Sequence, residues 1–376
     1  MSGFSLPHRL KTMAYLKRYM YDLMNDRKRG ALAQSVKGFL LMLSYIYGAL
    51  VKCNHFFYKV KLLKSYKSPI AVASVGNITL GGTGKTPFVA MLSRRMAQNG
   101  KKVGVLIRGY GEDEWEMLKD GLGEYGIKVF VGRDRVRFAK EALRSGFDCL
   151  ILDDGFQHLR LKRDLDIVLI DSTNPFGNGR LFPRGILREK TEGLKRADII
   201  VLTKADKGKD NMSKIESEIE KIASGKLVIK AVHSPKKLFD IRTEREEPLS
   251  FLNGRRICLV CAICDTSYFR YTAEKTGARI EAEFVFPDHY PYRTSDLNRI
   301  FEDCAEKNIN TIVTTEKDAV KLKKFMPKTG SPGAEKEPEK PCDILALNIV
   351  IEVVQKEEAL NAEIRRLHML YSGQNS

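Results

Sequence analysis

The sequence predicts an α/β protein with a larger parallel-sheet domain, a second, smaller α/β domain, and an apolar helix that precedes both. The length of 376 residues exceeds one ordinary domain. Short apolar runs alternate with helical stretches along most of the chain, and residues 1–68 carry a formal charge of +11 out of +17. We expect an N-terminal segment at 1–66, the first domain at 67–225, a linker at 226–256 and the second domain at 257–376.

The apolar runs of the first domain are continuous, which is typical of parallel strands covered on both faces. These runs lie at 103–107, 128–131, 149–152, 165–170 and 199–202, and a helical pattern at 133–145 follows the second of them. The second domain repeats this alternation. Strand-like runs there lie at 256–263, 283–286, 311–313 and 344–354, with helices at 267–276 and 295–307. Residues 327–341 are rich in Pro, Gly and charge, and we expect a disordered insertion.

A glycine-rich loop follows the apolar run at 70–73 and precedes a helical pattern. Its residues SVGNITLGGTGKT include Gly81, Gly82, Thr83 and Gly84, followed by Lys85 and Thr86. Such a loop turns backbone N–H groups toward phosphate oxygens at a helix N-terminus. Lys85 is then expected to reach the terminal phosphates and Thr86 to bind Mg²⁺. The strict pattern has glycine where this chain has Thr79, but the order strand, loop, helix favours a P-loop NTPase-type domain and a nucleoside triphosphate.

The N-terminal segment combines positive charge with an apolar run. Residues 1–68 contain 13 Lys and Arg against Asp22 and Asp26, and 38–51 are uncharged over 14 residues. Nucleic acid or an anionic membrane would both attract such charge. The apolar run favours the membrane and argues against nucleic acid, and it is shorter than the ~20 residues of a spanning helix. A buried helix of a soluble domain is the alternative. No signal-peptide pattern is present, so we expect a peripheral or monotopic protein that binds the membrane from the cytoplasm.

Seven cysteines without framework spacing are typical of a reducing compartment. Cys258, Cys261 and Cys264 have the C-x₂-C-x₂-C spacing of iron–sulfur sites, but no suitable fourth cysteine follows. Their neighbours read as a buried strand, in which cysteine behaves as a small hydrophobic residue.

Two further patterns indicate nucleotide chemistry. The run at 149–152 ends in Asp153 and Asp154, an arrangement that places carboxylates near Mg²⁺ in P-loop enzymes. Thr203-Lys204-Ala205-Asp206 resembles the guanine-reading motif of GTPases. A GTPase switch or metal-insertion chaperone therefore stays open, as does a membrane scaffold with a degenerate nucleotide site.

Several segments together resemble the tetraacyldisaccharide 4′-kinase family, which phosphorylates an acylated glucosamine disaccharide with ATP and Mg²⁺ in lipid A synthesis. The resemblance spans about residues 35–325, and the segments that carry it are GNITLGGTGKTP, RGYG, DDGFQHLRLKRDLDIVLID, FGNGRLFPRGILRE, FPDHYPY and TTEKDAVKL. It implies a protein at the cytoplasmic face of the bacterial inner membrane, and we expect a monomer.

The resemblance also implies roles for individual residues. Lys85 and Arg188 would bind phosphate, and the metal site would be formed by Thr86, Asp153, Asp154, Gln157 and Glu189. Arg108 in RGYG could touch phosphate or a lipid headgroup. The catalytic acid maps to Asp113 and its histidine partner to His289. Here Trp115 replaces the family's proline and the stretch after RGYG is shortened, so Asp113 rests on the weakest match.

Chemistry supports such an assignment. A sugar hydroxyl is a poor nucleophile, so a carboxylate must take its proton as it attacks the γ-phosphate. A histidine bonded to that carboxylate would orient it.

Overall fold

The computed structural model describes residues 16, 19–109, 112–326 and 342–372. The chain divides into two compact units. The first comprises Met1–Gly109, Gly121–Ala231 and Val353–Ser376, and the second comprises Tyr110–Asp120 and Val232–Glu352. The expected insertion at 327–341 lies outside the described residues.

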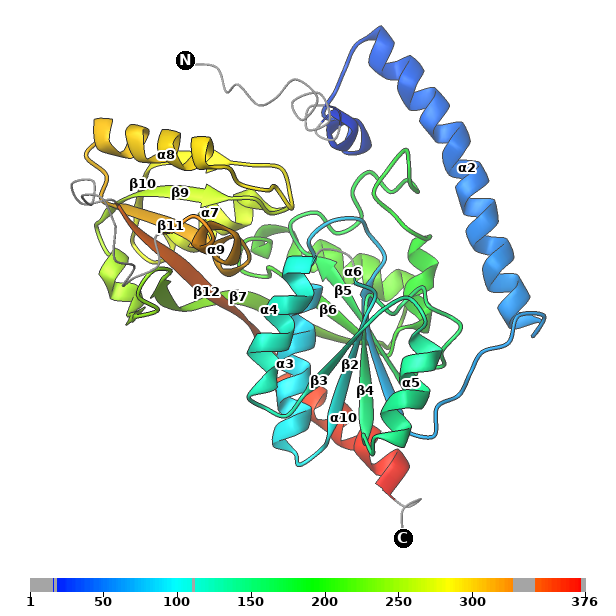
Figure 1. Ribbon diagram of the computed structural model, residues 1–376. Helices are drawn as coiled ribbons and strands as arrows, with labels where there is room; N and C mark the ends of the chain where they lie inside the picture. The colour runs from blue at the N-terminus through cyan, green and yellow to red at the C-terminus, as the bar shows by residue number, and fades with distance from the viewer. Residues whose placement is uncertain (1–15, 17–18, 110–111, 327–341, 373–376) are drawn as a thin grey trace. The chain divides into compact units, whose positions relative to one another are not determined.

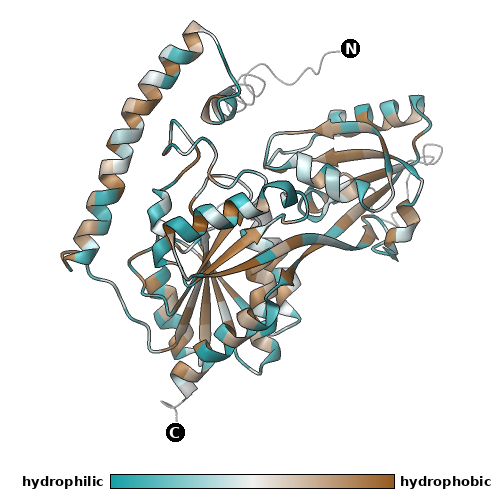
Figure 2. Cartoon of the chain, turned by 180° about the vertical axis from the view of Figure 1, so that it is seen from behind, coloured by the Kyte–Doolittle hydropathy of each residue, from teal (hydrophilic) through white to brown (hydrophobic). Residues whose placement is uncertain are grey.

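The first unit contains a parallel sheet with the strand order β7-β6-β5-β1-β4-β2-β3. The strands β1, β2, β4, β5 and β6 are almost entirely buried, which confirms the predicted α/β class with a parallel sheet. Figure 2 shows them as a brown, apolar fan. Their bounds are β1 Ala71–Asn77, β2 Val103–Ile107, β3 Lys128–Val131, β4 Cys149–Asp153, β5 Leu165–Asp171, β6 Ile199–Thr203 and β7 Leu227–Asp240.

Crossover connections place helices on both faces of this sheet. The chain moves outward from β1 to β2 through α3 and returns from β3 to β4 through α5, so right-handed connections put the two helices on opposite faces. Figure 1 shows α3 and α5 on either side of the strands. Asp134 caps α5 by accepting a hydrogen bond from Arg137 N. The helices of this unit include α2 Ala31–Lys59, α3 Lys85–Gln98, α5 Arg135–Arg144, α6 Met212–Ile222 and α10 Glu357–Ser372, with 3₁₀ turns η1 Thr191–Arg196 and η2 Lys209–Asn211.

The second unit has a parallel sheet with the order β10-β9-β11-β12. Its core includes Ile257 and Leu259 of β9, Phe269 of α7, and Val313 of β11. The elements are β8 Glu246–Glu247, η3 Leu249–Leu252, β9 Arg256–Cys261, α7 Thr266–Glu274, β10 Arg279–Val285, α8 Thr294–Glu306, β11 Thr311–Thr315, α9 Glu316–Lys323 and β12 Asp343–Gln355. Helix α4, Glu112–Gly123, has most of its residues in this unit.

The stretch 226–256, expected as a linker, contains regular structure. It includes β7, whose first residues pair with β6 and whose last residues pair antiparallel with β8. The division between the two units falls inside β7, between Ala231 and Val232. Lys230 and the run Ser234–Lys237 interrupt its apolar residues, so its sequence resembles a linker although its backbone pairs as a strand.

The apolar run at 38–51 forms the middle of α2, which is twice as long as the run itself. One 18-residue window of α2 has a mean hydropathy of 1.4 with 17% of it buried, so by length and composition the helix could cross a membrane. One face is nevertheless anchored to the rest of the first unit. Lys37 and Arg184 donate to the carboxylate of Asp26, at 2.7 and 2.6 Å, and tie the turn before α2 to a loop far along the chain.

The Asp26 cluster generates a pH prediction. Burial alone would raise the pKa of Asp26, but hydrogen bonds from Lys37, Arg184 and Asn178 lower it to about 2. An unfolded aspartate has a pKa near 3.9, so the stabilising effect is complete above that pH and is lost as the pH falls toward 2. We expect Asp26→Asn, which also tolerates the positive φ of 59°, to lower the melting temperature at pH 7. The gap from the unmodified chain should narrow below pH 4.

Differential scanning fluorimetry across pH 3–7 measures this gap. Asp22→Asn is the control, since its carboxylate lies 3.9 Å from its nearest cations. A gap that does not change with pH would contradict the role of the Asp26 charge.

The approach of β1 to the turn after β4 leaves no space at Gly76. A Cβ added there would lie 2.5 Å from Phe156 Cβ and 2.8 Å from Phe156 N. We expect Gly76→Ala to destabilise the protein by about 1–3 kcal/mol through overpacking. Gly38→Ala is the control, because a Cβ added at this position of α2 would have no atom within 4 Å. Thermal unfolding should show a lowered melting temperature for Gly76→Ala alone; equal melting temperatures would refute the packing argument.

Candidate active site

The loop between β1 and α3 has the backbone form that binds phosphate. Gly81 and Gly84 have φ angles of 118° and 83°, in the region that favours glycine. Thr83 is held from two sides, because Asn77 Nδ2 donates to its hydroxyl at 3.1 Å and Thr203 donates to its carbonyl at 3.0 Å. Directly after Gly84, Lys85 begins α3, so the loop ends at a helix N-terminus with its positive dipole.

A second segment, about one hundred residues later, lies directly against this loop. Leu80 N donates to Ile186 O at 2.7 Å, and Arg188 N donates to Ile78 O at 2.8 Å. These two backbone hydrogen bonds fix the 186–188 segment at the loop's edge. They place Arg188 beside the glycine loop.

Asp154 brings the two cationic side chains together. Arg188 donates to both of its carboxylate oxygens, at 2.6 and 2.9 Å, and Lys85 Nζ lies 3.7 Å from Oδ1. Burial would raise the pKa of Asp154, but the Arg188 hydrogen bonds and the charge of Lys85 lower it to about 2. The carboxylate is therefore ionised at neutral pH. It holds one ammonium and one guanidinium group beside the glycine loop.

Arg135 supports the same turn from behind, a role that no sequence pattern indicates. Its guanidinium donates to the Asp154 carbonyl at 3.1 Å and also to the Asp153 carbonyl. The side chain is buried, at 4% exposure. Its position in an apparently ordinary basic helix hid this contact, because only the fold brings α5 beneath the turn after β4.

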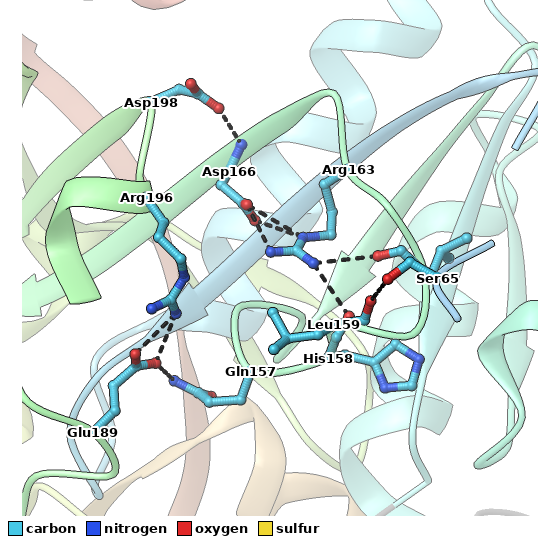
Figure 3. Close-up of polar contacts among 10 residues, drawn as sticks. Ser65, Gln157, His158, Leu159, Arg163, Asp166, Glu189, Arg196 and Asp198 are labelled. Carbon is cyan, nitrogen blue, oxygen red and sulfur yellow. Dashed lines mark hydrogen bonds and ion pairs between the residues drawn. The ribbon is translucent and has the colours of Figure 1, made fainter. Parts of the chain in front are cut away.

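Glu189 forms a buried polar cluster with two partners (Figure 3). Gln157 Nε2 donates to Glu189 Oε1 at 2.9 Å and to Asn77 O at 2.8 Å. Arg196 Nη2 lies 2.8 Å from Glu189 Oε2. The remaining amide oxygen, Gln157 Oε1, is buried and has no hydrogen-bond partner among the described residues. An oxygen of this kind suits a hard cation.

The turn that carries Gln157 is itself fixed. Arg163 donates to Asp166 Oδ2 at 2.8 Å and to the carbonyls of His158 and Leu161 at 3.3 Å (Figure 3). Burial and the surrounding arginines, Arg135 foremost, lower the pKa of His158 to about 4, so this imidazole is neutral at pH 7.

The predicted metal residues are not assembled into a ready cation cage. Among the residues that the structure describes, no three His, Cys, Asp or Glu side chains gather as a metal site. Asp154 is paired with Arg188, and Glu189 with Arg196. Thr86 lies in the first turn of α3, half-buried. Any cation here would thus depend on few protein oxygens together with phosphate, which is usual for Mg²⁺.

In the second unit, His289 lies in a turn with a φ of 60°. Lys317, near the start of α9, places its Nζ 3.0 Å from Asp288 Oδ1 and 3.3 Å from His289 Nε2. Lys317 belongs to the segment TTEKDAVKL, yet no role was assigned to it from the sequence. Asp113 falls in the first turn of α4, within the same unit, and its side chain lies outside the described residues. Arg108 is exposed directly after β2.

The two remaining motifs are the cysteine spacing at 258–264 and TKAD at 203–206, and most of their motif residues are buried in the fold. Cys258 and Cys261 are buried in β9 and Cys264 is exposed. Cys304 and Cys342 are buried as well. Lys204 of the TKAD motif is buried and forms an ion pair with Asp171 at the end of β5.

The family model described as tetraacyldisaccharide-1-P 4′-kinase matches residues 36–367 of this chain. A tetraacyldisaccharide 4′-kinase from Syntrophus aciditrophicus is 38% identical over 75% of this chain and 83% of its own length. Another from Halothermothrix orenii is 34% identical over 83% and 91%.

A solved structure agrees with these sequence matches. The crystal structure described as the "apo" form of LpxK from Aquifex aeolicus in complex with ATP has a TM-score of 0.64 and 28% identity. It covers 89% of this chain and 99% of that one. The glycine loop, the Asp154 ion pairs and the Glu189 cluster therefore lie in a protein whose sequence matches one family over nearly its whole length. The chain belongs to the tetraacyldisaccharide 4′-kinase family.

Proposed function

We propose that this chain is an ATP-dependent lipid kinase that transfers the γ-phosphate of ATP to the 4′-hydroxyl of tetraacyldisaccharide 1-phosphate in lipid A biosynthesis. The observation that carries the proposal is the convergence of Lys85 and Arg188 on one point beside the glycine loop, in a chain of this family. Phosphoryl transfer develops charge on the equatorial oxygens, and fixed cations at that point stabilise it.

In this scheme the Asp154 carboxylate first pairs with the two cationic side chains and later binds the metal ion. Its carboxylate holds Lys85 and Arg188 in place through the contacts described above. The phosphates of ATP are stronger competitors for both cations, since Arg binds phosphate bidentately. ATP binding would thereby release the Asp154 carboxylate, which then becomes available as a metal ligand.

Mg²⁺ fits the oxygens that surround the loop. This ion prefers hard oxygen donors. Those near the loop are the unpartnered Gln157 Oε1, the Thr86 hydroxyl and the carboxylates of Asp153, Asp154 and Glu189. When bound, it neutralises charge on the β- and γ-phosphates. Arg196 and Gln157 hold the Glu189 side chain in one orientation, so its carboxylate is positioned in advance.

We infer that Asp113 takes the proton from the sugar hydroxyl and that His289 orients it. Lys317 supports the second role. An ammonium group can only donate, so a hydrogen bond at His289 Nε2 makes that nitrogen the acceptor. The ring proton then lies on Nδ1, which can donate to a carboxylate. The Lys317–Asp288 ion pair fixes the ammonium group in place.

The substrate explains the N-terminal helix. An acylated disaccharide stays in a membrane, and α2 exposes large apolar side chains along its length, with basic residues before and after it. We infer that this chain binds the anionic cytoplasmic surface of the inner membrane as a monomer, with the exposed face of α2 in the lipid. A switch GTPase would not need such a surface together with the phosphate site.

Incubation with ATP or GTP, Mg²⁺ and the acylated disaccharide separates these functions. We expect phosphorylated lipid from ATP, and a loss of about 100-fold or more in kcat on Lys85→Ala. Lys101→Ala, a lysine outside the loop, is the control. GTP hydrolysis without lipid product would instead favour the switch, and no turnover of either nucleotide would favour the scaffold.

The proposed histidine geometry predicts a second kinetic effect. Lys317→Met should lower kcat by about tenfold to a hundredfold with little change in the KM for ATP, because misorientation affects the chemical step. Lys324→Met, exposed just beyond the same helix, should leave both constants unchanged. A raised KM at constant kcat would show that Lys317 serves nucleotide binding instead.

A further inference from the structure

One face of α2 packs against the segment that carries the phosphate-site residues. Lys37, Leu40 and Ser44 are buried along that face, and Tyr47 continues it at the next helical turn. Lys37 and Leu40 contact Asp26 and Leu23 near the start of the chain. Ser44 and Tyr47 contact residues 181–188, which lead directly into Glu189. The contact therefore joins the proposed membrane helix to the proposed phosphate site within the first unit.

Ser44 and Gly48 bring the two backbones close together. The Ser44 hydroxyl donates to Leu181 O at 2.8 Å and accepts from Arg184 N at 2.9 Å. A Cβ at Gly48 would lie 2.7 Å from Leu181 Cδ1, so glycine permits this approach. Tyr47 packs edge-to-face on Phe182, with ring centroids 5.8 Å apart.

Tyr47 makes the most direct connection to the site. Its hydroxyl donates to the carbonyl oxygen of Arg188 at 2.7 Å. The same residue sends its guanidinium to Asp154 and Asn77, and its N–H to Ile78 in the glycine loop. Arg188 is thus held between α2 and the loop. A shift of α2 by a fraction of a helical turn would move the backbone of Arg188 with it.

The opposite face of α2 is exposed and apolar. Phe39, Tyr45 and Leu50 are 58, 67 and 64% exposed, and Met42 and Ile46 are also more than half exposed. Figure 2 shows brown segments along the length of this helix. The two faces thus have different surroundings: one contacts the phosphate-site segment, and the other is free to enter a lipid surface.

We propose that α2 couples lipid-surface binding to ATP binding, with Tyr47 and Ser44 as positioning residues for Arg188. This inference rests on the proposed kinase function and membrane location. Insertion of the exposed face into lipid restricts the helix, and the Tyr47–Arg188 hydrogen bond transmits that restriction to the phosphate site. Because binding coupling is reciprocal, ATP should also strengthen attachment to the surface.

The affinity of the full chain for a fluorescent ATP analogue, with and without vesicles, tests the coupling. The vesicles contain phosphatidylethanolamine and phosphatidylglycerol and no disaccharide substrate. We expect vesicles to tighten nucleotide binding by about fivefold or more in the unmodified chain, the lower range of allosteric coupling. Tyr47→Phe should abolish that difference while vesicle pelleting is unchanged. Tyr45→Phe, on the exposed face of the same helix, should keep it.

Ser44→Ala is a second variant with the same expectation, so the test does not depend on one substitution. A kinetic readout accompanies it: Tyr47→Phe should raise the KM for ATP on vesicles more than it lowers kcat. Equal nucleotide affinity with and without vesicles in a chain that pellets with them would overturn the coupling alone. Failure to pellet would overturn the coupling and the membrane location together. Loss of lipid phosphorylation in the unmodified chain would overturn the proposed function, whatever the vesicle result.

Discussion

The ion pair between Asp154 and Arg188 is the interaction on which the site depends. It joins the turn after β4 to residues 186–188, which lie outside the strands of the sheet. Lys85 also lies close to the same carboxylate. Without it, three cationic groups, Lys85, Arg135 and Arg188, would lie near one another with little to balance their charge. The lowered pKa of Asp154 indicates that its carboxylate stays ionised at neutral pH and balances part of this positive charge.

The geometry of the sheet makes this pair possible. Strands β1 and β4 are parallel neighbours with Val75 opposite Asp153, so the glycine loop and the double aspartate leave the sheet at the same edge. Position 76 must be glycine for the turn after β4 to approach β1 so closely. The loop then pairs with residues 186–188 by backbone hydrogen bonds. Backbone pairing fixes the positions of the side chains, and the charges then determine what the site can bind.

Much of the fold could be predicted from the sequence because buried parallel strands have continuous apolar sequences. The runs at 103–107 and 128–131 coincide with β2 and β3, and those at 149–152 and 165–170 each lack only the final aspartate of the strand. Strand β7 was expected to be part of a linker because Lys230 and the run Ser234–Lys237 interrupt its apolar residues. The glycine loop, the aspartates and the segment that ends in Arg188 and Glu189 were identifiable from motif and family resemblance. The supporting roles of Arg135, Tyr47 and Lys317 were not, because each depends on contacts between residues far apart in sequence.

The close contact between Ser44, Gly48 and the 181–184 segment has a practical consequence for work with this enzyme. Apolar N-terminal helices are commonly deleted to obtain a soluble protein. Deletion here would expose more of Leu181 and Phe182 to water and leave the Arg188 carbonyl without the Tyr47 hydroxyl. A soluble form is better sought by replacing outward side chains such as Phe39, Met42 and Leu50 with polar ones. Such a protein would lose the lipid affinity that we propose for α2 and keep the inner face of the helix as a structural support.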